Sequence, residues 1–169
     1  MRKATYLLAL GAIAAGAFGW LTAAQVQPAS AFDRMKTLVG TWQAVVPQEG
    51  TLTTTIRLVS NGTALEEIAQ GAEHEQMVTL YTPDGNRLAL THYCNAGNQP
   101  RMESPNVTAD QKEFAFSLTG ITNLANPNAG HMHHLLIQIA DADHFTETWT
   151  WRENGKDKLH TLHYKRTRS

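Results

Sequence analysis

Two short histidine patterns in this sequence could bind a metal ion or a small molecule. The first is His92-x-Cys94, which holds the only cysteine of the chain, and the second is His131-x-His133. Side chains two residues apart on a β-strand share one face and lie about 6.6 Å apart along the strand. Imidazole nitrogen and thiolate sulfur are donors that suit zinc or copper. If the two patterns meet in space, they supply four donors to a transition-metal site.

The same residues allow two other kinds of chemistry. Cys94 with His92 or His133 could form a nucleophile and its base, if a nearby imidazolium lowers the pKa of the thiol. No local cysteine-hydrolase signature accompanies Cys94, and a lone buried cysteine is usually inert packing, so the sequence does not favour an enzyme. Alternatively, the histidines only hydrogen-bond one another and water in a polar cavity that binds an organic ligand or nothing.

The elements that position these residues are predicted to be β-strands. After residue 38 almost no segment has a helical period, whereas alternation and turn signals recur about every eight to twelve residues. One short helix is expected over 32–39. The ten expected strands are 40–47, 51–60, 62–70, 74–82, 86–95, 99–107, 112–119, 131–140, 143–152 and 157–166.

The short connections between these strands predict an all-β fold, a ten-stranded antiparallel up-and-down barrel. Closure of the sheet removes the unpaired edges that an open sheet would expose. Side chains need not fill the lumen of such a barrel, so we expect a ligand cavity. An open β-sandwich is the alternative. The sixth strand is the weakest expectation, because Pro105 would confine it to an edge or a bulge.

Strand parity predicts that both histidine patterns point inward. His92 and Cys94 share a face with two leucines, and His131 and His133 share a face with Leu135 and two isoleucines. If the sixth segment is a strand, His92 and Cys94 at the end of the fifth strand lie at the same barrel end as His131 and His133 at the start of the eighth. If it is a loop, the two patterns lie at opposite ends.

Four further residues are candidates for ligand contact. Glu147, Trp149 and Trp151 share one face of the ninth strand, where an unpaired carboxylate among aromatic side chains would be costly. Glu147 could replace a metal ligand or orient one, and the two tryptophans are strand aromatics that could form a ligand platform. Arg101, near the same end, could meet an acidic headgroup or pair with Glu103.

The segment Leu38-Val-Gly-Thr-Trp42, placed between the helix and the first strand, resembles the Gly-x-Trp signature of calycins. That superfamily contains lipocalins, fatty-acid-binding proteins and nitrobindins. The resemblance implies that Trp42 closes one end of a barrel and that a basic residue of the last strand, Lys165, Arg166 or Arg168, packs over it. The fuller Gly-x-Trp-x-Gly-x-Gly pattern of nitrobindins and the lipocalin disulfides are absent.

Resemblance to known proteins also bears on export and on the cofactor. The segments His92-Tyr-Cys94-x-Ala-Gly-Asn-Gln-Pro-Arg-Met102 and Gly130-His-Met-His133 are similar to those of an uncharacterised family of exported bacterial proteins. Because nitrobindin-like barrels hold haem through one histidine in an apolar cavity, haem is a third, less favoured cofactor after zinc and copper. Met77, Met102 or Tyr81 would line that cavity.

The first residues have the features of a leader that directs export. Arg2 and Lys3 precede an apolar run from Ala4 to Leu21, and Ala29-Ser-Ala31 has the small-x-small pattern of a signal-peptidase site, with a weaker alternative at Ala24. Cleavage after Ala31 leaves a single domain, 32–169, in the periplasm or outside the cell. The expected partner is a small-molecule ligand, with no stable membrane insertion after cleavage, and the oligomeric state stays open.

Charge excludes one class of partner. The whole chain has a formal net charge of −1 at pH 7, and loss of Arg2 and Lys3 lowers it by two, to −3. A chain so close to neutrality is not an electrostatic binder of nucleic acid. The sequence thus predicts an exported barrel that binds a small molecule, with a transition-metal protein and a cysteine-dependent enzyme as alternatives.

Overall fold

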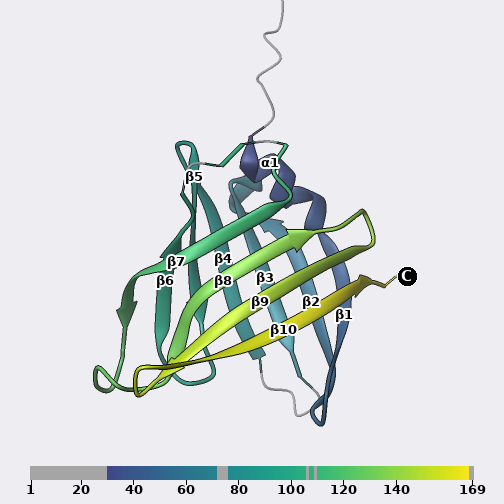
Figure 1. Cartoon of the computed structure of the whole chain (residues 1–169). Coiled ribbons are helices and arrows are strands. Elements are labelled where there is room, and N and C mark those ends of the chain that lie inside the picture. Colours follow the sequence, from purple (N-terminus) through teal and green to yellow (C-terminus); the bar gives the residue numbers. More distant parts are fainter. Residues whose placement is uncertain (1–29, 72–75, 106, 109, 168–169) are drawn as a thin grey trace, which may run out of the picture.

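The chain forms a closed ten-stranded antiparallel barrel with one short helix before it (Figure 1). The computed structural model describes residues 30–71, 76–105, 107–108 and 110–167. The helix α1 (Ala31–Met35) continues into a 3-10 turn, η1 (Lys36–Leu38). A second 3-10 turn, η2 (Ser60–Gly62), joins the second and third strands. Within the described ranges, no helix has the length and apolar character needed to cross a membrane.

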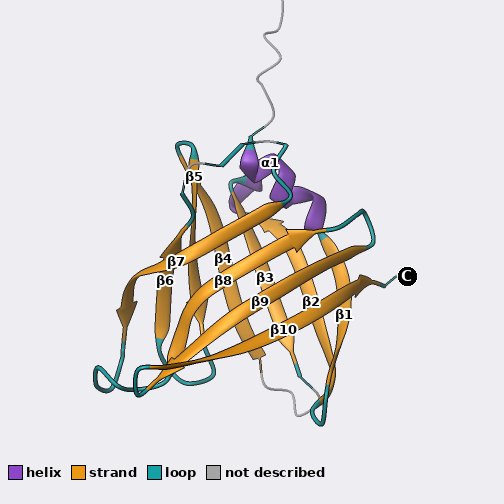
Figure 2. Ribbon diagram, viewed as in Figure 1, coloured by secondary structure: helices purple, strands orange, loops and turns teal. Residues whose placement is uncertain are grey.

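The ten strands run up and down in chain order (Figure 2). They are β1 (Gly40–Val46), β2 (Gly50–Val59), β3 (Ala64–Gln70), β4 (Gln76–Asp84), β5 (Arg87–Tyr93), β6 (Gln99–Glu103), β7 (Glu113–Thr122), β8 (His131–Ile139), β9 (His144–Glu153) and β10 (Lys156–Arg166). Each strand pairs with its neighbours in sequence, and β1 pairs with β10. The predicted barrel is therefore confirmed.

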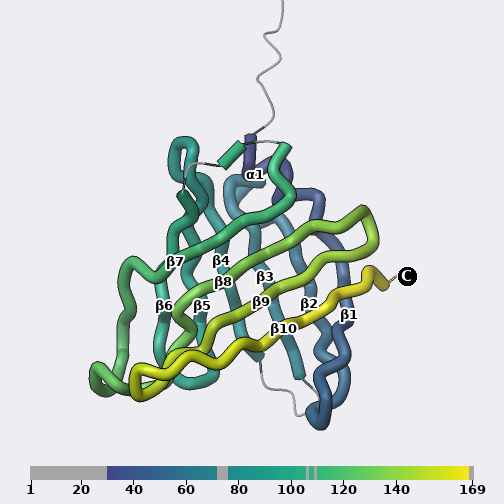
Figure 3. Tube along the Cα trace, viewed as in Figure 1, coloured from purple at the N-terminus to yellow at the C-terminus, as the bar shows by residue number. Residues whose placement is uncertain are grey.

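The sixth strand, which decides whether the two histidine patterns lie at the same end of the barrel, is present. β6 pairs with β5 through Thr91 and Arg101 and with β7 through Gln99 and Thr122. It ends at Glu103, before Pro105, because a proline cannot donate to the ladder. The starts of β8 and β10 therefore lie at the same barrel end as the finish of β5, which we call the mouth. Figure 3 shows the hairpins β1–β2 and β9–β10 at this end, opposite α1.

The other end of the barrel is sealed by the helix and an aromatic cluster. Phe32, Met35 and Leu38 are buried under Trp42. The Trp42 ring meets Phe145 edge-on at 4.7 Å, and Phe145 stacks on Tyr164 at 4.5 Å between ring centroids. These rings fill the lumen on the helix side, because large aromatic side chains bury more apolar area than any others. The hollow part of the barrel is left toward the mouth.

Arg166 joins this plug to the last strand. Its guanidinium carbon lies 3.9 Å from the Trp42 ring centroid, and its nitrogens donate to the carbonyls of Thr37, Val39 and Ala142 at 2.9, 2.7 and 2.8 Å. Of the three basic residues that the sequence offered for this position, Arg166 occupies it. Gly40 has a φ of +144°, and a Cβ there would collide with the Arg166 guanidinium, so no larger residue fits.

The start of α1 is fixed by a capping box. The Ser30 hydroxyl accepts from the backbone N–H of Asp33, and the Asp33 carboxylate accepts from the backbone N–H of Ser30. The predicted leader, 1–31, lies almost wholly outside the described residues and stays a prediction. Cleavage after Ala31 would remove Ser30 and its cap, whereas the alternative cleavage after Ala24 would keep both.

We expect Arg166→Lys to lower the free energy of unfolding by roughly 1–3 kcal/mol, because lysine cannot reproduce the planar fork that serves three carbonyls. Arg57→Lys is the matched control, since Arg57 is exposed and forms an ion pair with Glu66 worth roughly 0–1 kcal/mol. Urea titrations of the two variants and the wild type measure the difference. Equal losses in both variants would show that Arg166 does not hold the closure.

Candidate functional site

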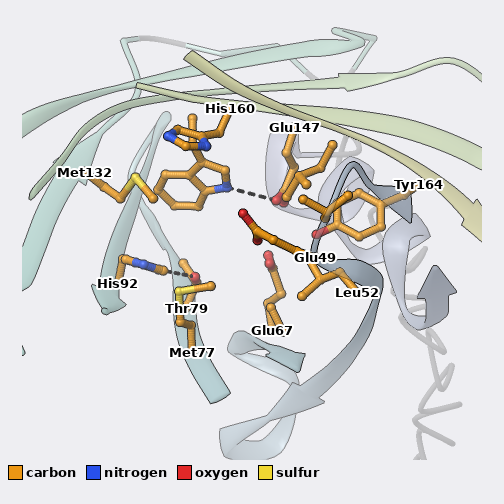
Figure 4. A pocket seen from close by; sticks show the side chains of 14 residues that line it. Glu49, Leu52, Glu67, Met77, Thr79, His92, Met132, Glu147, His160 and Tyr164 are labelled. Atoms are coloured by element: carbon orange, nitrogen blue, oxygen red, sulfur yellow. Dashed lines mark hydrogen bonds between the residues drawn. The ribbon is translucent and has the colours of Figure 1, made fainter. Parts of the chain in front are cut away.

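The lumen contains an inner chamber of about 150 Å³. Figure 4 shows the side chains that line it. The chamber opens to an outer vestibule of about 620 Å³ at the mouth. The vestibule and the chamber share four lining residues, which therefore mark the passage between them: Glu49, Met77, Met132 and His160. The remaining chamber residues lie deeper and come from seven strands: Val46, Leu52, Glu67, Ala69, Thr79, His92, Glu147, Trp149, Leu162 and Tyr164.

Two buried carboxyl groups occupy opposite walls of this chamber. Glu67 on β3 lies in a cross-strand row with Thr79 and His92, and Glu147 on β9 pairs with Leu162 on β10. Tyr81 donates its hydroxyl proton to Glu67 Oε2 at 2.7 Å, and Trp149 Nε1 donates to Glu147 Oε2 at 3.0 Å. Glu147 Oε1 is buried without any hydrogen-bond partner among the described residues.

The surroundings of both carboxyls favour the protonated form. Glu67 is 3% exposed and Glu147 is 1% exposed. Burial, followed by the negative charge of Glu67, raises the pKa of Glu147 well above its ordinary value. Burial also raises the pKa of Glu67, while hydrogen bonds with Tyr81 and with Glu147 lower it. The hydrogen bond between the two carboxyls in turn adds to the raised pKa of Glu147. The chamber therefore contains two carboxyl groups that resist ionisation unless a cation or a hydrogen-bond donor binds beside them.

His92 forms the adjoining wall as a neutral imidazole. Its Nδ1 lies 2.9 Å from Thr79 Oγ1, and its ring lies 4.7 Å from the Trp149 ring. Burial lowers the pKa of His92 to about 4, so the ring carries no charge at neutral pH. Its Nε2, like Glu147 Oε1, is buried without a partner in the part of the chain described. Two unpaired polar atoms thus line one chamber, an arrangement that folding alone does not favour.

The structure places some of the residues predicted from sequence in the lumen and others outside it. His92, Glu147 and Trp149 line the inner chamber, as their strand parity predicted, and Trp151 lines the vestibule. Arg101 lies on the outer face of the barrel in a shallow hollow over β4–β7, beside Glu103. Arg101 therefore does not face a lumenal ligand.

Cys94 is buried at the end of β5 but lines neither compartment. Its thiol contacts the side-chain oxygen of Asn95 at 3.6 Å, and the turn that follows is closed by backbone hydrogen bonds between Cys94 and Asn98 and between Gly97 and Cys94. The loop over 123–130 holds this turn, because Asn123 donates to Gly97 O and Asn98 donates to Gly130 O. Burial raises the pKa of the Cys94 thiol, which disfavours the thiolate that a nucleophile requires.

A β-bulge changes the direction of the second histidine pattern. The register of β8 against β9 shifts between Met132 and His134, so His133 is the extra residue. Met132 consequently faces the lumen opposite Trp151, while His131 aligns with Arg152 and His133 Nε2 lies 2.7 Å from the Arg152 guanidinium. Neither His131 nor His133 lines the chamber or the vestibule, although His131 is buried, so the structure does not bring this pattern to the lumenal cavity. A bulge inverts strand parity, and nothing in the alternation of the sequence marks it.

These positions leave the predicted metal site without a common centre. His131 contacts His133, with 5.7 Å between ring centroids, whereas His92 contacts Trp149. Among the described residues, no three side chains of histidine, cysteine, aspartate or glutamate are grouped so that they could hold a metal ion. Zinc or copper binding through His92, Cys94, His131 and His133 therefore stays a prediction with no supporting geometry.

The chamber beside His92 does not fit haem. Its volume, about 150 Å³, is below the range of roughly 300–1,000 Å³ typical of sites for drug-sized molecules, and a porphyrin is larger than most of these. The carboxyls of Glu67 and Glu147 also occupy the walls that a macrocycle would press against. Met77 does line the chamber, but Met102 and Tyr81 are fully buried in the core.

Glu67 is the residue of this site that the sequence did not single out. In β3 both alternations are plausible, because Leu65, Glu67 and Ala69 share one face while Ala64, Glu66 and Ile68 share the other. The clue lay in the neighbouring strand, where Met77, Thr79 and Tyr81 form an equally mixed set. Pairing aligns Glu67 with Thr79 and Leu65 with Tyr81, and only that register decides which face is interior.

Comparison with known proteins supports the fold and no more. No family model and no curated protein matches this sequence. Among solved structures, the crystal structure of Rv2717c from M. tuberculosis is similar, with a TM-score of 0.58 and 16% sequence identity. The match covers 83% of this chain and 99% of that one. At this identity the likeness concerns the architecture of the barrel.

We expect Glu147→Gln to raise the free energy of unfolding at pH 7 by about 1–3 kcal/mol, because the amide removes a carboxyl that resists ionisation when buried. A raised folded-state pKa contributes stability below the unfolded pKa of roughly 4.3 that is lost as pH rises, so the variant should also lose less stability between pH 4 and 8 than the wild type.

Urea titrations at several pH values measure both effects. Glu66→Gln is the matched control for Glu147→Gln. Glu66 is the neighbour of Glu67 in β3, but it faces outward and pairs with Arg57. A Glu147→Gln variant with the same pH dependence as the wild type would contradict the assignment of raised pKa values to this pair.

We expect Cys94 to react with iodoacetamide at pH 7.5 at least about tenfold more slowly in the folded protein than in urea, because burial raises the pKa of its thiol. Intact mass spectrometry reads the reaction directly, since the chain has a single cysteine. Fast alkylation of the folded protein would restore Cys94 as a candidate nucleophile.

Proposed function

We propose that this protein binds a small organic molecule inside the barrel. One observation carries the proposal: His92 Nε2 and Glu147 Oε1 are buried without partners among the described residues, and both residues line one chamber that leads to the mouth. A buried polar atom without a partner costs roughly 1–3 kcal/mol, so such atoms accumulate where a ligand or water completes them. The lining also includes apolar side chains such as Val46, Leu52 and Leu162, and a mixture of apolar walls and a few polar groups is typical of small-molecule sites.

The proposal includes membership of the calycin type. It is supported by Gly40 and Trp42 at the start of β1, by the short helix before them, and by Arg166 of the last strand over the Trp42 ring. Each of these positions matches the arrangement that the Gly-x-Trp resemblance implies. We also propose export to the periplasm or the outside, which is supported by the basic residues and apolar run of the predicted leader.

A carrier fits this geometry better than an enzyme. The groups that face the chamber are two carboxyls that favour their protonated forms and a neutral imidazole, and no activated nucleophile is among the described lining residues. The passage between vestibule and chamber is lined by Met77 and Met132, whose flexible side chains adapt to ligands of varied shape.

Filling the chamber tests the proposal. Ala69 lines it and is 8% exposed, so Ala69→Leu should occupy the ligand volume without altering the mouth. Ala89→Leu is the matched control, because Ala89 lies on the outer face of β5. We expect at least one small organic fragment to bind the wild type in ligand-detected NMR, with affinity lowered about tenfold or more by Ala69→Leu only.

Native mass spectrometry and solvent extraction of the purified protein provide the complementary measurement. A retained organic compound should be present in the wild type and the Ala89→Leu variant and depleted in the Ala69→Leu variant. A clean mass for the wild type, together with no fragment that Ala69→Leu displaces, would contradict lumenal ligand binding.

A further inference from the structure

The inner chamber is rich in carboxyl groups. Its described lining residues include no lysine and no arginine, whereas Glu67 and Glu147 face it from opposite walls and Glu49 stands at its entrance. The other titratable groups around the pair are His92 on β5, Tyr81 on β4, and His160 and Tyr164 on β10. In the vestibule, lysines and acids are mixed: Lys156, Lys158, Glu153 and Asp157.

The two carboxyls lack the partners that would stabilise them as anions. Besides a hydrogen bond between the two carboxyls, which requires that one of them is protonated, each accepts one from another side chain, Tyr81 or Trp149, although a carboxylate can accept about four. Glu147 Oε1 receives none. In the tautomer that donates from Nδ1 to Thr79, His92 Nε2 is another acceptor without a partner. The chamber therefore offers unpaired acceptors, and its two carboxyls gain negative charge when they ionise.

We infer that the ligand is a small organic cation whose protonated amine enters the inner chamber between Glu67 and Glu147. This inference rests on the proposed function and specifies its ligand. An ammonium group has three donors and no acceptor, which matches a site with unpaired acceptors. Its positive charge offsets the repulsion and desolvation that raise the pKa of each carboxyl.

Aromatic and apolar walls suit the rest of such a ligand. The rings of Trp149 and Tyr164 line the chamber, and a cation near the face of a tryptophan or tyrosine gains roughly 0.5–2 kcal/mol. A chamber of about 150 Å³ holds a headgroup with a few carbon atoms. Leu162, Met77 and Met132 then provide an apolar path for a hydrocarbon or aryl body toward the vestibule.

Binding of a cation is linked to proton release. The ammonium group favours the ionised forms of Glu67 and Glu147, so protons held by the pair leave to solvent as the ligand enters, while the ammonium keeps its own. Affinity for an amine should consequently increase as pH rises from 5 to 8, over a range in which an alkylamine stays fully charged. A neutral ligand lacks this dependence.

Matched probes of equal length test the inference: n-hexylamine and 1-hexanol. Isothermal titration calorimetry of the full folded protein, in phosphate and in MOPS, measures affinity and proton release together, because the two buffers differ in their enthalpy of ionisation. We expect hexylamine to bind about tenfold or more tightly than hexanol at pH 7.5, with net proton release.

Three variants locate the binding. Glu67→Gln and Glu147→Gln should each weaken hexylamine binding about tenfold or more, whereas Glu66→Gln, on the outer face of the same strand, should not. The proton release is measured on the wild type, so it does not depend on how the variants fold.

The outcomes separate this inference from the proposed function. Equal affinity for hexylamine and hexanol, with binding lost in Ala69→Leu, would overturn the cation assignment and leave lumenal ligand binding in place. No saturable binding of hexylamine, or binding without proton release that both Gln variants retain, would overturn the inference as well.

Discussion

The closure between β1 and β10 is the contact on which the barrel depends, and it is short. Trp42 aligns with Arg166 and Gln43 with Lys165, while β1 pairs with β2 over its whole length. The Arg166 guanidinium extends this closure by stacking on Trp42 and serving carbonyls of the segment before β1 and of the β8–β9 turn. A planar group with several donors suits this task, because it satisfies backbone acceptors and covers an aromatic ring together.

The position of the chamber follows from this closure. Beyond the two pairs the register between β1 and β10 stops, while β10 stays paired with β9 back to Lys156. Val46 and Leu52 on one side and His160 and Leu162 on the other therefore meet as walls of a cavity instead of neighbours in a ladder. The aromatic plug fills the helix side of the lumen, so the space that remains lies at the open end.

The fold was predictable from sequence where the polar–apolar alternation and the turn residues define the same strands. The direction of a side chain in the site was predictable where its strand has no bulge. β5 and β9 keep a regular pleat, so parity placed His92, Glu147 and Trp149 correctly in the lumen. β3 offers two faces of similar polarity, so Glu67 could be assigned only through its register with β4. In β8 a single extra residue, His133, inverts the parity of every residue before it.

That bulge also explains why the entrance of the chamber is lined by thioethers and not by the imidazoles of β8. With a regular pleat, His131 and His133 would have faced His92 and Glu147 across the mouth, and imidazolium groups near the carboxyls would have favoured their ionised forms. The bulge instead brings Met132 inward and leaves His133 beside Arg152, which Asp157 holds from the next strand. The positive charge of Arg152 is thus engaged outside the lumen. Neutralisation of Glu67 and Glu147 is left to protons or to a cation that arrives from the vestibule.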